Sequence, residues 1–320
     1  MSELLRQVGI WGTGSFAPPQ VVTNDDLAQR LETSDEWIHS RTGIRARRIA
    51  APGIFTSDLA SAAAEQALEA ANLSADDLDL VIVATSTPDH PGSFPSTAAL
   101  VQAKLGAKKA AAFDVGAVCA GFAYALHIGA QIVRAGAYSR VLIIGAEIFS
   151  RILDWQDRAT AVLFGDGAGA AVLGPVSENR GYLGGVLGAD GLGASLLHVS
   201  KDTGCVYQNG KEVYKFAVTI MGEAAAQAVA AAGLQTGDVD LFIPHQANIR
   251  IIEKAAARMG LPLSKVFVNL DRYGNTSAAS IPLALDEAVR AGRVQDGNIV
   301  VLVGFGAGLT WGANVLRWGR

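Results

Sequence analysis

The sequence predicts an α/β protein made of two similar halves, and two observations support this prediction. Short apolar runs alternate with alanine-rich stretches of helical period, which is the pattern of layered sheets covered by helices. Two pairs of segments also resemble each other across the middle of the chain. With 320 residues, of which 50% are hydrophobic, the chain is long enough to bury a large core.

The predicted elements alternate along the first part of the chain. Five apolar runs have the length and composition of buried strands. They are "VGIWGTGSF" (8–16), "LDLVIVATS" (78–86), "KKAAAFDVG" (108–116), "RVLIIGAEI" (140–148) and "AGAAVLGPV" (168–176). Between the first two lies "DLASAAAEQALEAANL" (58–73), whose apolar positions recur with the period of a helix.

The repeated segments are long and nearly collinear. Residues 64–82 lie over residues 225–243 at an offset of 161, and both contain D-x-D-L-x-I, which leads a helix into a strand. Residues 109–136 lie over residues 265–292 at an offset of 156. The chain therefore contains two copies of one αβ unit.

These repeats set the domain boundaries. We expect an N-terminal half at residues 1–175 and a C-terminal half at residues 176–320. The offset of 156 places Cys119 over Asn275, so one copy carries a thiol where the other carries an amide. Because related halves usually pack about a pseudo-twofold axis, we expect these two corners to meet and to form a site at their junction.

Composition narrows the class of protein. Two cysteines make no disulfide framework and no metal-ligand spacing is present, which favours a reducing, cytoplasmic setting and predicts no metal site. The N-terminal segment lacks the apolar stretch of a signal peptide, so we expect no membrane association. A net charge of −4 makes nucleic acid an unfavourable partner.

Cys119 lies in "DVGAVCAGFAYAL", ahead of an apolar run that predicts a buried helix. A buried cysteine often serves only to fill a core. The start of a helix, however, has free backbone N–H groups and the positive end of the dipole, which favour a nucleophilic thiolate. From the residues alone, the core and the nucleophile interpretations both remain open.

Three more segments bring polar groups or glycine to predicted strand ends. "FIPHQANIRI" contains His245, "DRYGNTSAAS" contains Asn275, and "VGFGAGLTWG" contains Gly306. A structural histidine and a helix-capping asparagine are the alternatives. Taken with Cys119, these residues predict acyl transfer through a thioester, with an oxyanion hole at the backbone N–H groups of Cys119 and Gly306.

The order of these motifs resembles a known family. "SDEWIHSRTGIRARRIA", "DVGAVCAGFAYAL", "FGDGAGAAVL", "PHQANIRI", "YGNTSAAS" and "GFGAGLTWG" are similar to segments of the thiolase-like condensing enzymes, and most closely of the β-ketoacyl-acyl-carrier-protein synthase III family. The resemblance implies a five-layered αβαβα architecture and a cytoplasmic homodimer. It also implies the condensation that initiates fatty acid biosynthesis.

In that reaction a short acyl-CoA primer, with acetyl-CoA as the expected one, acylates Cys119. Malonyl-acyl-carrier protein then loses CO2 and attacks, giving 3-oxoacyl-acyl-carrier protein and CoA. The resemblance makes His245 and Asn275 the donors that stabilise the carbanion. Acyl-CoA is a substrate here, so no cofactor is expected.

Binding residues are implied less directly. The residues matching CoA contacts are Trp37, Arg41, Thr42 and Arg158. Those matching the carrier-protein surface are Lys215, Gln246, Ala247, Asn248, Arg250 and Arg258. Ala257 departs from the pattern, because a basic residue is expected there. Phe94 matches a residue that crosses a dimer interface and closes the acyl pocket, where a bulky ring favours a short primer.

Other functions use similar residues. A biosynthetic thiolase has a second cysteine in a C-x-G turn, where this chain has "GFGAGLT", and the elongating condensing enzymes have a histidine in place of Asn275. The segment "QANIRI" and the length of the chain fit a 3-hydroxy-3-methylglutaryl-CoA synthase less well. A condensing enzyme of secondary metabolism with another primer, a cysteine thioester hydrolase and a non-catalytic scaffold are the remaining alternatives.

Overall fold

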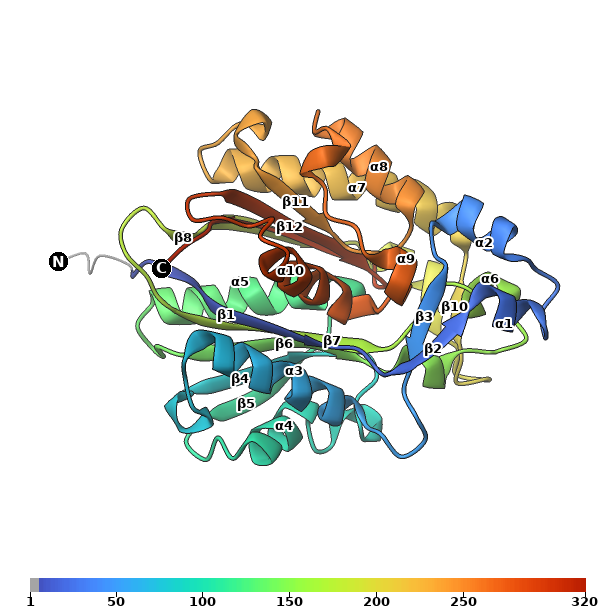
Figure 1. Cartoon of the computed structure of the whole chain (residues 1–320), viewed down its shortest axis with the longest axis horizontal. Coiled ribbons are helices and arrows are strands. Elements are labelled where there is room, and N and C mark those ends of the chain that lie inside the picture. The colour runs from blue at the N-terminus through green and yellow to red at the C-terminus, as the bar shows by residue number, and fades with distance from the viewer. Residues whose placement is uncertain (1–5) are drawn as a thin grey trace.

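The computed structural model describes residues 6–320, and these form five layers (Figure 1). Two β-sheets lie on either side of a central layer of two helices, α5 (Gly121–Arg134) and α10 (Ser280–Arg290). Further helices cover the outer face of each sheet. This is the αβαβα arrangement that the sequence resemblance implied.

The first sheet comes entirely from the N-terminal half and has the strand order β1-β7-β6-β4-β5. Its strands are β1 (Val8–Phe16), β4 (Leu80–Ala84), β5 (Ala111–Val115), β6 (Val141–Glu147) and β7 (Gly167–Pro175). β4 is parallel to β5 and β6, whereas β7 is antiparallel to β1 and β6. α3 (Thr56–Ala71) and α4 (Thr97–Leu105) cover its outer face. All five predicted strands are present.

The second sheet comes entirely from the C-terminal half and has the order β11-β12-β13-β8. Its strands are β8 (Gly181–Ala189), β11 (Leu241–Pro244), β12 (Ile299–Gly306) and β13 (Thr310–Arg317). The counterpart of β5 is reduced to one bridge, between Phe242 and Val266. α7 (Gly210–Ala231) and α8 (Ile249–Arg258) cover the outer face. The predicted division after residue 175 falls between β7 and β8.

Smaller elements extend the molecule beyond one end of the main sheets (Figure 1). They are β2 (Gln20–Thr23) paired with β3 (Ala46–Ile49), β9 (Leu197–Val199) paired with β10 (Val206–Gln208), and the helices α1 (Asn24–Ala28), α2 (Asp35–Thr42), α6 (Arg158–Ala161) and α9 (Leu270–Tyr273). Among the helices of residues 6–320, none combines the length and the apolar character needed to cross a bilayer.

The two central helices begin with equivalent turns. Val118 and Ser277 both have left-handed backbones, with φ values of 47° and 50°. Each is the first residue of a three-residue 3-10 turn that leads directly into α5 or α10. Residues 159 positions apart are therefore equivalent at these turns, so Cys119 corresponds to Ala278.

This equivalence corrects the predicted alignment of Cys119 with Asn275. The offset of 156 holds at the ends of the helices, Arg134 and Arg290, but not at their beginnings. The cause is a length difference, because α5 has 14 residues and α10 has 11. The two corners do meet as expected, but Asn275 precedes the equivalent turn.

Each turn packs against a glycine on a strand of the other half. A Cβ atom on Gly145 of β6 would lie 2.1 Å from the carbonyl oxygen of Ala278. A Cβ atom on Gly304 of β12 would lie 3.2 Å from the carbonyl oxygen of Cys119. The two glycines are also 159 positions apart, so the close packing of the halves follows the same pseudosymmetry.

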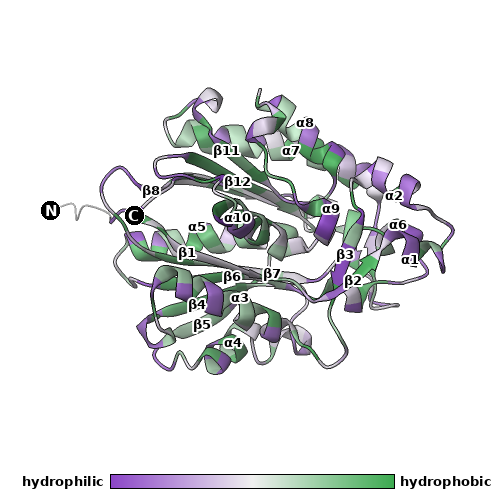
Figure 2. Ribbon diagram, in the orientation of Figure 1, coloured by the Kyte–Doolittle hydropathy of each residue, from purple (hydrophilic) through white to green (hydrophobic). Residues whose placement is uncertain are grey.

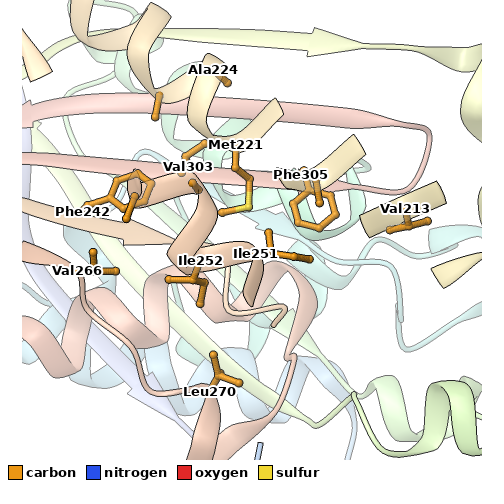
Figure 3. Close-up of a cluster of buried hydrophobic side chains, with 14 of the residues drawn as sticks. Val213, Met221, Ala224, Phe242, Ile251, Ile252, Val266, Leu270, Val303 and Phe305 are labelled. Atoms are coloured by element: carbon orange, nitrogen blue, oxygen red, sulfur yellow. The ribbon is translucent and has the colours of Figure 1, made fainter. Parts of the chain in front are cut away.

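The apolar residues gather inside these layers. Figure 2 shows strands such as β6 and β12 in green, whereas α1 and α2 at the end of the molecule contain more purple. Figure 3 shows part of the core to which α7 and α8 contribute, where Met221 and Ile252 belong to the same buried cluster as Phe242 and Phe305. Burying side chains of this size contributes about 1.5–3 kcal/mol each. This core therefore packs against the site described below.

Candidate active site

A cavity of about 470 Å³ opens at the junction of the two halves. Cys119, His245, Asn275 and Gly306 all line it. Cys119 lies in the turn before α5 and Asn275 just ahead of the turn before α10, whereas His245 and Gly306 lie at strand ends. The structure therefore brings together the residues predicted to perform the chemistry.

Cys119 is held by the turn that precedes α5. The left-handed backbone of Val118 directs the next residue into the cavity region, and the side chain of Cys119 is only 4% exposed. Its Sγ donates a hydrogen bond to Oγ of Ser277 at 3.3 Å. A Cβ atom on residue 306 would lie 2.7 Å from the backbone nitrogen of Cys119, so only glycine allows this approach.

The electrostatic environment of Cys119 differs from the prediction. Burial raises the pKa of its thiol to about 12, and the negative charge of Glu147 acts in the same direction. The hydrogen bond with Ser277 opposes this shift. The start of the helix was expected to lower this pKa, but desolvation is the largest cause of the shift and raises it.

His245 follows the carboxyl end of β11 and is 1% exposed. Burial lowers its pKa to about 3, so the imidazole is neutral at pH 7. Its Nδ1 lies 2.6 Å from Oγ of Ser280, and that oxygen also accepts the backbone N–H of Gln246 at 3.4 Å. The Ser280 hydroxyl can donate its proton to Nδ1, and in that arrangement Nε2–H is the free donor of the ring.

Asn275 is oriented in a similar way. Its Oδ1 accepts the backbone N–H of Ser277 at 2.8 Å, which leaves the Nδ2 protons as donors. Its backbone is fixed by the N-terminal half, since its N–H donates to Leu163 and its carbonyl accepts the N–H of Gly165. Two neutral N–H donors, on His245 and Asn275, therefore face one cavity.

The predicted CoA residues lie at the edge of the molecule. Trp37 of α2 is half-buried, and the guanidinium groups of Arg41 and Arg158 each lie 4.6 Å from the centre of its ring. Thr42 is buried, and its hydroxyl donates to the carbonyl of Ile38. The structure thus brings three of the four residues together and uses the Thr42 hydroxyl inside the protein.

Comparisons with known proteins place this site in a family. Residues 113–191 and 229–318 match the models of 3-oxoacyl-[acyl-carrier-protein] synthase III and of its C-terminal part. A β-ketoacyl-[acyl-carrier-protein] synthase III of Symbiobacterium thermophilum is 54% identical over 99% of this chain and 99% of that one. The chain belongs to the β-ketoacyl-[acyl-carrier-protein] synthase III family.

Solved structures agree with this assignment. The 3-oxoacyl-[acyl-carrier-protein] synthase III of Aquifex aeolicus has a TM-score of 0.94 at 47% identity, over 97% of this chain and 100% of that one. A priming β-ketosynthase from the R1128 polyketide biosynthetic pathway has a TM-score of 0.92 at 39% identity, over 99% of this chain and 97% of that one. The thiolase-like fold is therefore shared along the whole described chain.

One residue predicted for the carrier surface of this synthase III is not on the surface. Gln246 is 1% exposed, and its amide donates to the carbonyls of Pro244 and Phe267 while accepting the N–H of Asn269. All its polar groups are satisfied internally. The prediction that Gln246 contacts a carrier protein is therefore wrong, and its role is to hold the loop after β11.

Its neighbours lie closer to the cavity. Ala247 and Asn248 both line it, and Asn248 caps α8 by accepting the backbone N–H of Arg250 at 2.9 Å. The same side chain donates to the carbonyl of Arg41 at 3.0 Å. Asn248 therefore ties α8 to α2, which carries the predicted CoA residues.

The outer face of α8 carries a basic stripe that we define as Arg250, Lys254 and Arg258. All three are exposed and follow each other at intervals of four residues. Arg258 pairs with Glu223, and Lys215 on α7 pairs with Glu212 at 2.7 Å. The sequence reasoning missed Lys254, although its spacing from Arg250 and Arg258 places it on the same helical face. Ala257 is exposed beside the stripe and adds no charge.

Two further findings concern Phe94 and metals. Phe94 is 88% exposed and is absent from the cavity lining of this single chain. Within residues 6–320, no cluster of three or more His, Cys, Asp or Glu side chains could hold a metal ion.

The sequence reasoning also missed three residues near the site, which are Ser277, Ser280 and Glu147. The segment "NTSAAS" already places both serines close to Asn275 in the sequence.

Proposed function

We propose that this synthase III initiates fatty acid biosynthesis by condensing a short acyl-CoA with malonyl-acyl-carrier protein. The observation that carries the proposal is the convergence of one thiol and two oriented N–H donors, from Cys119, His245 and Asn275, on a single cavity. Transfer of an acyl group needs the first, and decarboxylation of a malonyl thioester needs the other two.

In the first half-reaction, Sγ of Cys119 attacks the carbonyl carbon of acyl-CoA. The carbonyl oxygen gains negative charge, which the backbone N–H groups of Cys119 and Gly306 stabilise in a site shielded from water. The C–S bond to CoA then breaks, and CoA leaves as a thiolate. The acyl group remains on Cys119.

In the second half-reaction, the malonyl thioester oxygen accepts hydrogen bonds from Nε2 of His245 and Nδ2 of Asn275. These neutral donors stabilise the enolate that forms as CO2 departs. The carbanion attacks the carbonyl carbon of the acyl group, the C–S bond to Cys119 breaks, and 3-oxoacyl-acyl-carrier protein leaves. Because the two donors supply the charge stabilisation, we propose no cofactor.

The surface residues suggest how the two substrates reach the cavity. Indole and guanidinium planes can hold an adenine ring, so Trp37 with Arg41 and Arg158 is the proposed nucleotide site. Carrier proteins that bear phosphopantetheine groups present an acidic surface, which the basic stripe on α8 and Lys215 complement. We place the reaction in the cytoplasm, where Cys119 and Cys205 stay reduced.

We also propose a homodimer in which Phe94 closes the partner's acyl pocket. Phe94 is 88% exposed in one chain, so inserting its ring into a second chain would remove apolar surface from water and stabilise the dimer. Phe94→Thr should then shift preference from two- to five-carbon primers toward primers of eight or more carbons by about tenfold or more. The measurement is relative kcat/KM across a primer series, with light scattering to follow the dimer. An unchanged profile in an intact dimer contradicts this role.

The central test uses labelled acetyl-CoA followed by malonyl-acyl-carrier protein. We expect one acetyl adduct on Cys119 by mass spectrometry, and then a 3-oxoacyl-acyl-carrier protein with release of CO2. A hydrolase would release free acetate, and a scaffold would give no adduct.

A primer series distinguishes this function from the one that the polyketide relative's name suggests. Efficient use of acetyl-CoA supports fatty acid initiation. Strong preference for longer or unusual primers favours a condensing enzyme of secondary metabolism.

A further inference from the structure

Glu147 is a buried acid that the reaction described above does not use. It is the last residue of β6, and its side chain is fully buried. None of the ion pairs within residues 6–320 involves it. A carboxyl group buried without a cation can hold a proton near neutral pH, and burial raises the pKa of Glu147 to about 7.

Hydrogen-bond donors surround this carboxyl group. Thr87 and Thr85 donate to Oε2 at 2.5 and 3.2 Å, and the backbone N–H of Ser86 lies 3.1 Å from Oε1. The remaining donor is the hydroxyl of Ser277, at 3.1 Å from Oε1. Ser277 comes from the other half of the chain, at the turn that faces Cys119.

These contacts connect Glu147 to the reactive thiol. Sγ of Cys119 donates to Oγ of Ser277 at 3.3 Å, and the same hydroxyl donates to Oε1 of Glu147. Ser277 and Glu147 are completely buried and Cys119 is nearly so, which leaves no bulk water along the path. The donors and acceptors are thus aligned in one direction, from thiol to carboxylate.

We propose that Ser277 and Glu147 form a proton relay that deprotonates Cys119 as it attacks acyl-CoA. This inference rests on the proposed acyl transfer. Ser277 takes the thiol proton on Oγ while passing its own proton to Oε1 of Glu147. The new bond joins sulfur to the acyl carbon, and the broken bond releases CoA thiolate, which takes a proton from solvent.

The second half-reaction restores the relay. When the carbanion has attacked, the tetrahedral intermediate expels Cys119 as a thiolate. Glu147 returns its proton through Ser277 to that sulfur. The proton therefore stays on Glu147 for the lifetime of the acyl-enzyme, and the relay consumes none over a cycle.

Electrostatics favour this transfer over direct ionisation. With Glu147 charged, a thiolate at Cys119 would place two negative charges at the ends of one short chain, and this repulsion raises the pKa of the thiol. Moving the proton to Glu147 leaves a single negative charge, on sulfur beside the start of α5. His245 is a weaker base for this step, because burial lowers its pKa to about 3.

The test is the pH dependence of Cys119 reactivity in Glu147→Gln and Ser277→Ala, both in a Cys205→Ser background. Single-turnover acetylation from acetyl-CoA is followed by rapid quench, and alkylation by iodoacetamide is followed in parallel. We expect both rates of the parent protein to level off above pH 7.5. In each variant we expect a fall of about a hundredfold at pH 7.5 and a rise of tenfold per pH unit up to pH 9.5.

A matched control is Asp166→Asn. Asp166 is a second fully buried carboxyl group, bonded to Ser150 and to the backbone of Ala50, with no contact to Cys119. It should keep the level pH profile of the parent. Melting temperatures show whether each variant folds, and Ser277→Ala decides the question if Glu147→Gln does not fold.

The outcomes separate this inference from the proposed function. Level profiles in both relay variants, or a profile in Asp166→Asn that matches theirs, overturn the relay. Absence of acetylation in the parent protein overturns the proposed function instead. Alkylation by iodoacetamide still reports on the relay in that case, because it requires no acyl-CoA.

Discussion

The two turns at the centre of the molecule have the same backbone and different chemistry. Val118 and Ser277 share a left-handed conformation, and each begins a short turn that leads into a central helix. In one turn the next residue is Cys119, beside Gly306 at the end of β12. In the other it is Ala278, and the strand-end residue in the place of Gly306 is Glu147 on β6.

This difference shows how a symmetric frame supports one active site. Gly306 allows the backbone of Cys119 to approach closely, at the proposed oxyanion hole, whereas Glu147 fills the equivalent space with a buried acid. The strand ends differ in the same way, because His245 follows β11 where the first sheet has Ala84 at the end of β4. The N-terminal half therefore holds the proposed nucleophile, and the C-terminal half holds the two proposed donors.

The largest expected effect tests the assignment of the nucleophile to the first turn. Cys119→Ala should abolish acyl-enzyme formation from labelled acetyl-CoA, since an alanine in this turn, like Ala278 in the equivalent one, has no thiol to accept the acyl group. Mass spectrometry of the intact protein measures the adduct. Cys205→Ser is the control and should keep the full adduct, and an adduct retained in Cys119→Ala would move the nucleophile elsewhere.

A smaller effect separates the roles of the two halves. Asn275→Ala removes one N–H donor, so condensation with malonyl-acyl-carrier protein should fall by about 10²–10³-fold while acetylation of Cys119 continues. Rapid-quench assays of each half-reaction measure this. A block in acetylation with normal decarboxylation would reverse the proposed division of labour.

The pH dependence of folding stability tests the environment of His245, at the end of β11. His245 gains a proton near pH 6.5 in the unfolded chain, but burial lowers its pKa in the folded protein to about 3. The free energy of unfolding is therefore highest above pH 6.5 and decreases as the pH falls below that value. Between pH 7 and pH 5 this contribution changes by about 2 kcal/mol. His245→Gln should remove that part of the pH dependence in urea unfolding. Parallel curves for the two proteins would contradict the neutral, buried imidazole.

The smallest effect concerns the outer helices α8 and α4, which occupy corresponding places on the two sheets. Arg250→Glu on α8 should raise KM for malonyl-acyl-carrier protein about tenfold, equal to ~1.4 kcal/mol, with less effect on acetyl-CoA. Added salt should shrink the difference. Lys108→Glu, an exposed charge beyond α4, is the matched control. An equal rise in KM for both substrates would instead mean that Arg250 stabilises the fold.

Much of the fold could be predicted because it depends on patterns that are local in the sequence. The five strands of the first sheet are continuous apolar runs, and the repeated D-x-D-L-x-I marks the start of a strand in each half. The alignment at Cys119 failed because the difference of three residues lies within α10, between matching ends. A left-handed backbone at Val118 has no sequence signal, since β-branched residues rarely adopt it.

The site could be predicted at the residues that carry its motifs. Cys119, His245, Asn275 and Gly306 do line one cavity. The burial of Gln246 and the link from Ser277 to Glu147 could not be predicted, because both depend on side chains that meet from distant segments. The direction of the thiol pKa shift likewise depends on burial that no local pattern reveals.

The left-handed turns also bear on the history of the chain. Holding Val118 and Ser277 at positive φ costs on the order of 1–3 kcal/mol each, and a random search would rarely reach the same costly conformation twice. The simplest origin is a single ancestral unit that already contained the turn and paired with its own copy. Duplication of such a unit accounts for both turns, which now differ in carrying the thiol of Cys119 in one and Ala278 in the other.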